Sequence, residues 1–295
     1  MPCRHMPPRY KQNSDVAKLL LFFLLPISSP FKTKETKLIR SYIYFEMADM
    51  HSFIATINEC IRREDGLSLA KSIHIPVGKK SIPRVYQQLA EKSKTLNAVS
   101  YCESNIIDSN IGTVFGNMIM ALVAYCSSKW TEVYDYELLA YNSLLGYFRE
   151  ETSNWIIPVL NVVSNDLRLI AQHADTMLLK RDNETLRDAL RNLTNGFNAV
   201  AKDRTPYTDP SSKKLAIFAV TNVLFKIYFK LNTLQLCSKL INVVERPGAG
   251  NALEAVRLFP VSDVVTYKFY IGRLKMFEDK YEEARCDTNL CCVVL

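Results

Sequence analysis

Apolar residues recur at helical spacing along most of the chain after residue 50. A first stripe contains Phe53, Ile54, Ile57 and Ile61, and Asp65-Gly66 ends it. Further helices are expected over residues 114–125, 131–149, 153–180, 185–201, 215–230, 234–244 and 261–278, with a last one beginning at residue 280. The period-two alternation of a strand is sustained nowhere, so the pattern predicts an all-α fold.

Two stretches interrupt this pattern. Residues 72–112 contain Pro76 and Pro83 and predict short helices joined by loops. Residues 203–214, DRTPYTDPSSKK, are polar and contain two prolines, which is typical of a loop. Before the long helix that follows residue 152, Ser153 is expected to act as the cap, because its hydroxyl can accept from a free N–H of the first turn.

A weak repeat recurs three times along the chain. In each copy an aromatic or apolar helix end is followed by a short polar turn, a large apolar residue and, three positions later, a small or apolar one. The pairs are Trp130 with Val133, Leu234 with Cys237, and Tyr281 with Ala284. The large residue is expected to anchor the second helix of a hairpin, and the smaller one to let the two helices approach closely. This design predicts a tetratricopeptide-like solenoid, and the irregular spacing of the copies makes it a degenerate one.

The net charge of the chain is concentrated near its N-terminus. The formal charge is +7, but residues 1–46 hold eight Lys or Arg against three Asp or Glu. The remaining residues hold 29 basic side chains against 27 acidic ones. The helical part is therefore nearly neutral, and its bulk charge does not indicate a nucleic-acid-binding protein.

The residues that usually carry chemistry are scattered. None of the eight cysteines forms a Cys-x-x-Cys pair or has a histidine at ligand spacing, so no zinc site is predicted. Only nine glycines are present, and neither a glycine-rich phosphate loop nor a Gly-x-Ser-x-Gly nucleophile turn occurs. No grouping of nucleophile, base and orienting residue is visible, so we predict no enzyme and no cofactor.

Residues 1–46 contain the run KLLLFFLLPI at 18–27. This run is too short to cross a bilayer as a helix, which needs about 20 apolar residues. A secretory signal is a weaker alternative, because prolines interrupt both its basic region and its cleavage zone. We interpret residues 1–46 as a disordered or non-native leader.

Cations alternate with aromatic residues in FKIYFK (225–230) and TYKFYIGR (266–273), and a lysine pair follows Ser212. One interpretation is a nucleic-acid or partner surface, with rings that stack and cations that meet phosphate. The other is a helix whose aromatic face is buried while its lysines extend outward to solvent. The candidate surface residues are Lys213, Lys214, Lys226, Lys230, Lys268 and Arg273.

The last four residues, Cys292 to Leu295, match the pattern for a geranylgeranyl anchor. Cys292 is therefore a candidate lipidation site, and Cys291 could carry a second lipid. The preceding LKMFEDKYEEAR has mixed charge, so the polybasic second signal that stable anchoring usually needs is missing. A membrane role is accordingly the weaker expectation.

Three runs of the chain resemble one known family. They are NWIIPVLNVVSNDLRLIA (154–171), SKKLAIFAVTNVLFKIYFKLNTLQLC (212–237) and VTYKFYIGRLKMFEDKYEEA (265–284). They are similar to PCI-domain-containing protein 2 and its fungal relatives, subunits of the transcription-and-export complex at the nuclear pore. The resemblance covers roughly residues 47–284 and is weaker before residue 115.

The resemblance implies a right-handed helical solenoid that leads into a PCI module with a winged helix. It implies two protein partners, a large scaffold subunit of the germinal-centre-associated nuclear protein type and a small acidic DSS-type protein. RNA or DNA would be bound within the complex. The implied activity is non-enzymatic support of messenger RNA export and transcription, in the nucleus and at the nuclear pore.

The chain departs from the family at both ends. Residues 1–46 have no counterpart, and the family continues well beyond Ala284, so we expect the winged helix to be missing and the acidic-partner site to be incomplete. The hairpin that opens at Tyr281 is expected to lose its second helix and to leave an apolar face uncovered. The expected divisions are a leader (1–46), irregular helices (47–112), a solenoid (113–285) and an unrelated tail (286–295).

Three hypotheses for the function follow. The first is a scaffold subunit that binds partner proteins through its solenoid. The second is a direct nucleic-acid binder that uses the basic-aromatic helix faces. The third is a lipid-anchored helical adaptor, and solenoid subunits of the signalosome or proteasome lid are the fold-level alternative for the family.

Overall fold

The computed structural model describes residues 50–75, 77, 87, 90–91, 97–246 and 251–294, with side chains in the last helix described up to Asp287. All of these residues belong to one compact unit, Met47–Leu295. The expected leader, much of the irregular stretch before residue 97 and the side chain of Cys292 lie outside the described residues. The predictions made for them stay predictions.

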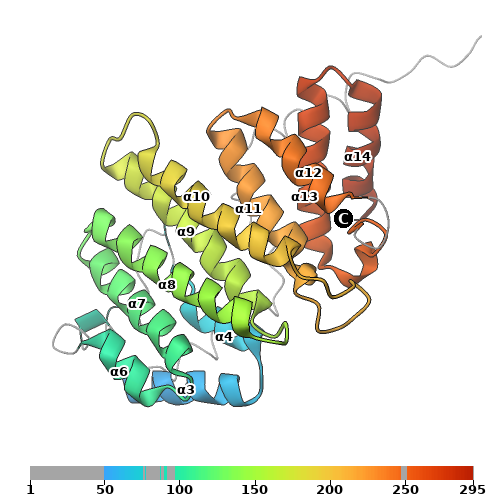
Figure 1. Ribbon diagram of the computed structural model, residues 1–295. Helices are drawn as coiled ribbons and strands as arrows, with labels where there is room; N and C mark the ends of the chain where they lie inside the picture. Colours follow the sequence, from blue (N-terminus) through green and yellow to red (C-terminus); the bar gives the residue numbers. More distant parts are fainter. Residues whose placement is uncertain are drawn as a thin grey trace, which may run out of the picture. The chain divides into compact units, whose positions relative to one another are not determined.

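The described residues form α-helices and short 3-10 segments and contain no strand (Figure 1). The α-helices are α3 (Met50–Arg62), α4 (Gly66–Ile73), α6 (Ala98–Asn105), α7 (Ser109–Cys126), α8 (Trp130–Glu150), α9 (Ile157–Met177), α10 (Glu184–Ala201), α11 (Ile217–Lys230), α12 (Cys237–Val244), α13 (Val261–Phe277) and α14 (Tyr281–Val294). The prediction of an all-α chain is confirmed, and most predicted boundaries lie within a few residues of the observed ones.

Successive helices pair as antiparallel hairpins that stack on one another. Figure 1 shows the hairpins α7–α8, α9–α10 and α11–α12 in order, followed by α13–α14. Helix α9 packs on α8, α10 and α11, and α11 in turn packs on α13. Helices α9, α11 and α13 therefore form one layer, and each hairpin is covered by the next. This is the predicted helical solenoid.

Short polar side chains fix the starts of the N-terminal helices. Asp65 accepts from the backbone N–H of Ser68 at 2.9 Å at the start of α4. At the start of α7, Asp108 accepts from the N–H groups of Asn110 and Ile111. These bonds satisfy donors that the first turn of a helix leaves free. Several later hairpin turns instead place one residue in the left-handed region, for example Ser128 and Asp279.

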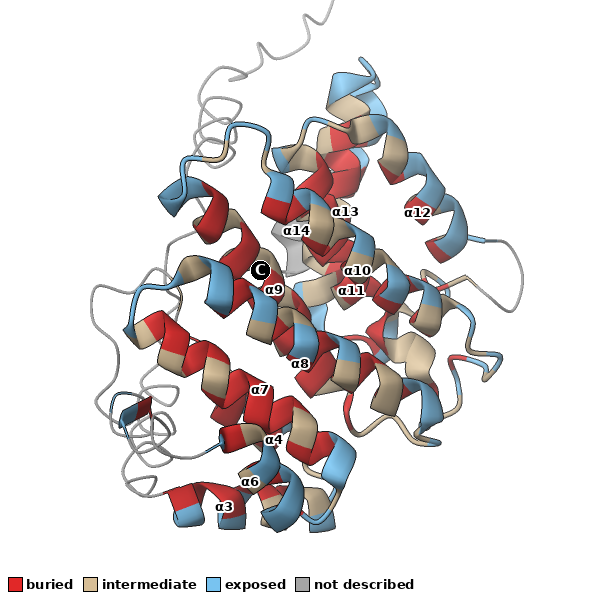
Figure 2. Cartoon of the chain, turned by 60° about the vertical axis from the view of Figure 1, so that its left-hand side comes forward, coloured by how far each residue is buried: buried red, intermediate tan, exposed pale blue. Residues whose placement is uncertain are grey.

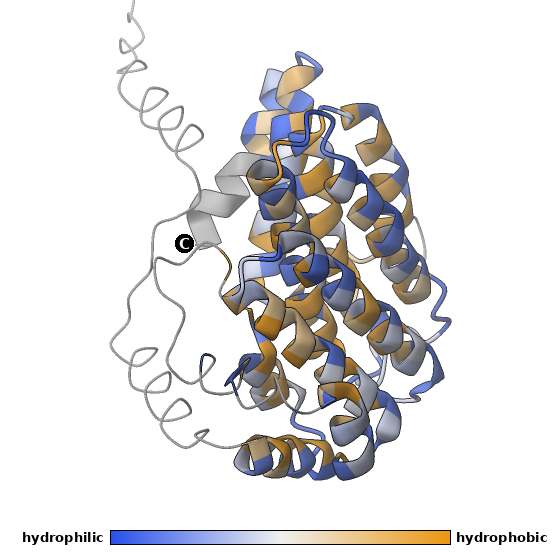
Figure 3. Ribbon diagram, turned by 90° about the vertical axis from the view of Figure 1, so that its left-hand side faces the viewer, coloured by the Kyte–Doolittle hydropathy of each residue, from blue (hydrophilic) through white to orange (hydrophobic). Residues whose placement is uncertain are grey.

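The core lies between the hairpins. Figure 2 shows buried positions along the sides of the helices that face their neighbours, and Figure 3 shows polar positions along the outer edges. Aromatic residues fill the contact between α11 and α13, where the rings of Phe225 and Tyr267 stack at 5.7 Å. The ring of Phe218 lies 4.9 Å from Tyr267 in the same contact. Aromatic contacts of this kind add to the free energy gained from burial alone.

Helix α7 is long and apolar enough to span a membrane by length and composition. Within its apolar window, 67% of the residues are buried against the rest of the fold. A central helix of a packed domain shows the same burial, so the length and composition of α7 are only weak evidence for a membrane span.

The long helix does not begin at Ser153, as the sequence predicted. Helix α9 begins at Ile157, and Pro158 occupies its first turn, where a missing N–H costs nothing. The Glu151 carboxylate accepts from the N–H groups of Thr152 and Ser153 and so holds them in a turn instead.

The repeat pairs are only partly as expected. The small partners Val133, Cys237 and Ala284 are all buried at helix contacts. Tyr281 does not anchor its helix, since its side chain is 63% exposed and its hydroxyl donates to Asp279. The small side chain of Ala284 is buried where α14 packs on α13.

The hairpin opened at Tyr281 keeps its second helix, which corrects the sequence prediction. Helix α14 runs on to Val294, past the point where the family resemblance ends. Asp287 on this helix accepts hydrogen bonds from Lys268 and Lys275 of α13, at 3.0 and 2.8 Å. These two charge-assisted bonds across the hairpin hold α14 against α13.

Candidate functional site

The six predicted cations do not form one surface, and several have structural partners. Lys213 lies just before α11, and its Nζ donates to the carbonyl oxygens of Phe148 (2.6 Å) and Arg149 (3.3 Å) at the end of α8. A cation in this position satisfies free carbonyl groups and the negative end of the helix dipole. Lys213 therefore joins two hairpins and is not available to a ligand.

Lys214 and Lys268 are also engaged within the fold. The Nζ of Lys214 lies 5.5 Å from the centre of the Tyr207 ring, a cation–π contact. Lys268 forms a salt bridge with Asp287, and the two side chains are only 17% and 11% exposed. Although burial raises the pKa of Asp287, the hydrogen bonds from Lys275 and Lys268 hold it below its usual value.

Arg273 covers two aromatic rings of the basic-aromatic runs, those of Phe229 and Phe269. Its guanidinium carbon lies 4.8 Å from the centre of the Phe229 ring and 5.7 Å from that of Phe269. The Phe229 ring also packs on Tyr270 at 5.0 Å. These aromatic faces are therefore already occupied by protein atoms.

Lys226 and Lys230 lie one turn apart on α11 but in different surroundings. Lys230 ends the helix and is exposed. Lys226 is half-buried. Burial, and then the nearby Arg168 guanidinium, lower the pKa of the Lys226 amine to about 8, while Asp263 acts in the opposite direction. No salt bridge joins this amine to a carboxylate among the described residues.

Arg168 on α9 is the residue that the list of predicted cations missed. Its Nη2 donates to Asn165 Oδ1 at 3.0 Å, but its Nε is buried without a partner. Burial lowers its pKa, with Tyr270 and Asp166 acting against that effect. Arg168 belongs to the run 154–171 that carries the family resemblance, but no local pattern in that run predicted that its side chain would be half-buried.

Arg168, Lys226 and Arg273 come from the three adjacent helices of one layer, α9, α11 and α13 (Figure 1). After burial, the charge of Arg168 is the next cause that lowers the pKa of Lys226. Burial raises the pKa of Tyr270, and the charges of Arg273 and Arg168 both act against that rise. Lys213 and Lys268 are held in contacts elsewhere in the fold.

A buried carboxyl cluster lies across α8 and α9. Asp166 is fully buried and accepts from the backbone N–H of Ile75 at 3.0 Å, and its Oδ2 lies 2.9 Å from Nδ1 of His74. These contacts tie the segment after α4 to α9. Glu137 of α8 is also fully buried, but neither of its oxygens has a partner. Burial, with a further effect of Asp166, raises the pKa of Glu137 well above its ordinary value.

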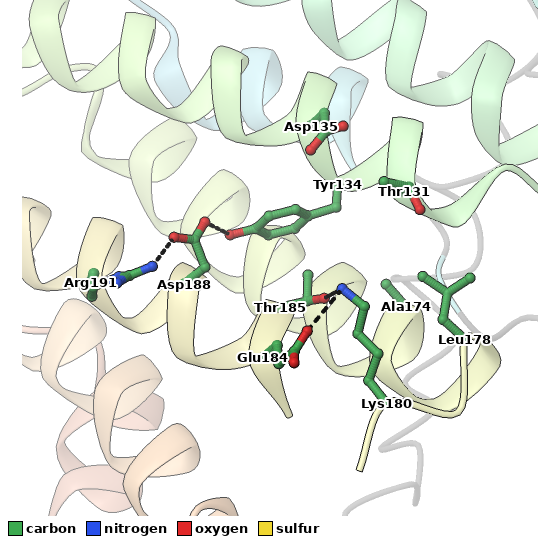
Figure 4. Close-up of a pocket in the computed structure, with 10 residues that line it drawn as sticks. All are labelled: Thr131, Tyr134, Asp135, Ala174, Leu178, Lys180, Glu184, Thr185, Asp188 and Arg191. Atoms are coloured by element: carbon green, nitrogen blue, oxygen red, sulfur yellow. Dashed lines mark hydrogen bonds and ion pairs between the residues drawn. The ribbon is translucent and has the colours of Figure 1, made fainter. Parts of the chain in front are cut away.

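A hollow of about 270 Å³ opens between the start of α8 and the turn that joins α9 to α10 (Figure 4). The Tyr134 hydroxyl donates to Asp188 Oδ2 at 2.7 Å, and Arg191 donates to the other oxygen of Asp188 at 2.7 Å. Lys180 donates to Thr185 and lies 3.8 Å from Glu184. These groups satisfy one another, and none of the residues lining this hollow forms a nucleophile–base pair.

No family model matches the chain, but curated proteins do. It is 32% identical over 192 residues to "PCI domain-containing protein 2 homolog" of Dictyostelium discoideum, covering 62% of this chain and 43% of that protein. It is 27% identical over 241 residues to "PCI domain-containing protein 2" of Xenopus laevis, covering 80% and 56%. A "Protein CSN12 homolog" of Neurospora crassa is 27% identical over 276 residues, covering 80% and 59%. The chain thus spans about half the length of the curated relatives it matches.

Proposed function

We propose that this chain, which is similar to PCI domain-containing protein 2 over much of its length, is a member of that family and a non-enzymatic scaffold subunit of a multiprotein complex. The stacked hairpins support this role, because a solenoid presents long helix faces on which other chains can lie. In the hollow of Figure 4, Tyr134, Asp188 and Arg191 are held in hydrogen bonds with one another, so the hollow offers no support for a catalytic role.

The finer proposal is that the complex acts in transcription and messenger RNA export, in the nucleus and at the nuclear pore. Its expected partners are a large scaffold subunit of the germinal-centre-associated nuclear protein type and a small acidic DSS-type protein. The support for this step is the similarity to that family. Large apolar side chains also lie exposed at hairpin ends, Leu179 at 85% and Phe277 at 64%, where they are available to a protein partner.

We expect the tagged full chain to co-purify with the large scaffold subunit from nuclear extract. The control is a tagged helical-repeat protein of similar size and charge, measured by quantitative mass spectrometry. Enrichment should persist at high salt if apolar contacts dominate the interface, because salt screens only the ionic part. The absence of enrichment over the control would remove the proposal.

Direct binding of nucleic acid is the second candidate function. It predicts that cations free to meet phosphate contribute to binding, whereas cations paired within the fold do not. Lys230→Met and Arg273→Met should weaken binding of single-stranded RNA and reduce its salt dependence by about one unit of slope per lost phosphate contact. Lys268→Met is the matched control, since Lys268 is paired with Asp287 and should have little effect. Filter binding at several salt concentrations measures this. Binding that does not depend on salt would exclude the candidate.

A further inference from the structure

The turn between α9 and α10 exposes three consecutive apolar side chains. Met177, Leu178 and Leu179 are 53%, 42% and 85% exposed. Leu179 is the most exposed large apolar residue in the described part of the chain. Single apolar residues on a surface are ordinary, but a contiguous group of them indicates a surface that another molecule covers.

The backbone at Leu179 shows that the turn itself does not require a leucine. Its φ of 53° lies in the left-handed region, which disfavours residues with a Cβ and is usually left to glycine or asparagine. The N–H of Lys180 donates to the carbonyl oxygen of Asp175 at 2.9 Å and closes the helix end. Helices α3, α7, α11 and α13 end in the same way, but their left-handed residues are polar: Glu64, Ser128, Asn232 and Asp279. Only the α9–α10 turn places a large apolar side chain at this position among these five described helix ends.

The hollow of Figure 4 adjoins this turn, because Leu178 and Lys180 line it. Both of its cations are engaged within the fold. Arg191 donates to Asp188 at 2.7 Å, and Lys180 donates to Thr185 at 3.1 Å. Three carboxylates stand against these two cations in the lining, namely Asp135, Glu184 and Asp188. The hollow therefore has an excess of negative charge.

Two of these carboxylates are open to solvent. Asp135 on α8 is exposed, and it forms no ion pair with any residue that the structure describes. The Glu184 carboxylate on α10 is 69% exposed, and it lies 3.8 Å from the Lys180 amine. Figure 4 shows Asp135 and Glu184 on opposite sides of the hollow. The surface thus combines an apolar turn with an acidic hollow.

We propose that this turn and the hollow beside it bind a basic amphipathic helix of a partner protein. The proposal rests on the proposed role as a complex subunit and adds a site and a ligand class to it. Apolar side chains of the helix cover Met177 and Leu179, and a lysine or arginine on the same face of the helix meets Asp135 at the hollow. The charge of the hollow selects a cation, and the turn selects an apolar neighbour.

A helix suits this surface better than an extended segment does. An extended segment needs a strand edge to satisfy its backbone N–H and C=O groups, and the described residues contain no strand. A helix satisfies its own backbone and can place apolar and basic side chains three or four positions apart on one face.

A lipid surface fits the same turn less well. A loop that enters a membrane interface directs cations toward anionic headgroups. Here Lys180 and Arg181 follow the leucines, but Asp182 and Glu184 follow them at once and cancel their charge. Lys180 is also engaged with Thr185. The net charge beside the turn therefore offers no attraction to an anionic membrane.

The test measures binding of a fluorescein-labelled peptide to the full chain by fluorescence anisotropy. The peptide has about five helical turns, with leucine at every third or fourth position and lysine between them. Two control peptides of the same length carry glutamine in place of every lysine or in place of every leucine. We expect the first peptide to bind and each control to bind at least about tenfold more weakly. Equal binding of the three peptides, or no binding of the first, would overturn the proposal.

Variants of the chain locate the binding surface. Leu179→Asn should weaken binding of the leucine-lysine peptide at least about tenfold, and Asp135→Asn should weaken it about threefold to tenfold. Leu67→Asn is the matched control for the first, since Leu67 on α4 is 59% exposed. Glu150→Gln, at the exposed end of α8, is the control for the second. Binding that is unchanged in Leu179→Asn would contradict the assignment.

Thermal unfolding of Leu179→Asn separates a binding role from a structural one. Asparagine suits the left-handed position better than leucine does, so Tm should stay unchanged or rise by about 1–3 °C while binding is lost. A lower Tm would show that the leucine supports the turn, and the proposal would then fail.

Three further outcomes keep this inference distinct from other roles. Phosphatidylserine vesicles that sediment the natural chain but not Leu179→Asn would assign the turn to a membrane and overturn the helix site. Undiminished co-purification of the large scaffold subunit with Leu179→Asn, together with no peptide binding, would leave the complex role standing and remove this site from it. Peptide binding that is lost in Leu179→Asn, in a chain that does not enrich the scaffold subunit, would support the site while removing that partner.

Discussion

The Glu137→Met variant is expected to be more stable than the natural chain by about 2 kcal/mol at pH 7.5. Glu137 is fully buried, and neither oxygen has a hydrogen-bond partner. Methionine has a similar length and shape, so it fills the same space while removing a polar group that the fold does not satisfy. Chemical denaturation of the full chain measures the difference.

The stability that Glu137→Met gains over the natural chain should decrease as the pH is lowered. Burial raises the pKa of Glu137 in the folded state, so the folded chain holds a proton that the unfolded chain releases above its ordinary pKa. Stability due to this group is therefore fully present below the unfolded pKa and is lost as pH rises toward the folded pKa. The advantage of Glu137→Met should shrink steadily as pH is lowered from 7.5 to about 5.

Two variants control this experiment. Glu132→Met removes a carboxylate from the exposed part of the same helix, where it pairs with Lys129, and should change stability by less than about 0.5 kcal/mol. Glu137→Gln removes the titration but keeps a polar group, so its stability should vary less with pH without reaching that of Glu137→Met. Destabilisation by Glu137→Met at every pH would mean that the carboxyl group has a supporting partner.

The helices could be predicted from the periodicity of apolar residues, but how deeply each side chain is buried could not. On α8 the helical spacing of Tyr134, Leu138 and Tyr141 predicts one apolar face, yet Leu138 is only half-buried whereas Glu137 is fully buried. Residue 137 follows Tyr134 by three positions and precedes Tyr141 by four, so the same periodicity also allowed it inside. A carboxylate is normally assigned to the surface because its burial is costly. Sequence reasoning therefore fails where the fold accepts that cost.

The candidate site shows the same limit. The alternation of cations and rings on α11 and α13 was visible in the sequence, but its meaning depended on partners far away along the chain. Lys213 reaches the end of α8, and Lys268 reaches Asp287 on a helix that was expected to be a tail. Arg168 becomes a site residue only because α9 lies beside α11. Such pairings between hairpins are not encoded in any local spacing.

Gly116→Ala should be strongly destabilising, by about 2–3 kcal/mol or more. Helix α7 carries Gly112 and Gly116 one turn apart, where it packs on α6. A Cβ at Gly116 would lie 2.5 Å from the Cα of Val99, which is backbone and cannot move aside as a flexible side chain would. The two helices would have to separate, and the loss of packing would outweigh the gain of about 1 kcal/mol in helix propensity.

Gly146→Ala is the matched control, because Gly146 lies within α8 with no atom near the position of an added Cβ. The same substitution there should raise stability by about 0.5–1 kcal/mol, since it only restricts the unfolded chain and favours the helix. Thermal and chemical denaturation of both variants measure the two stability changes. If these changes have opposite signs, the α6–α7 contact is the cause of the loss in Gly116→Ala. If Gly116→Ala were neutral, α6 would not be held against α7 at this distance, and the start of the solenoid would be packed more loosely than the structure shows.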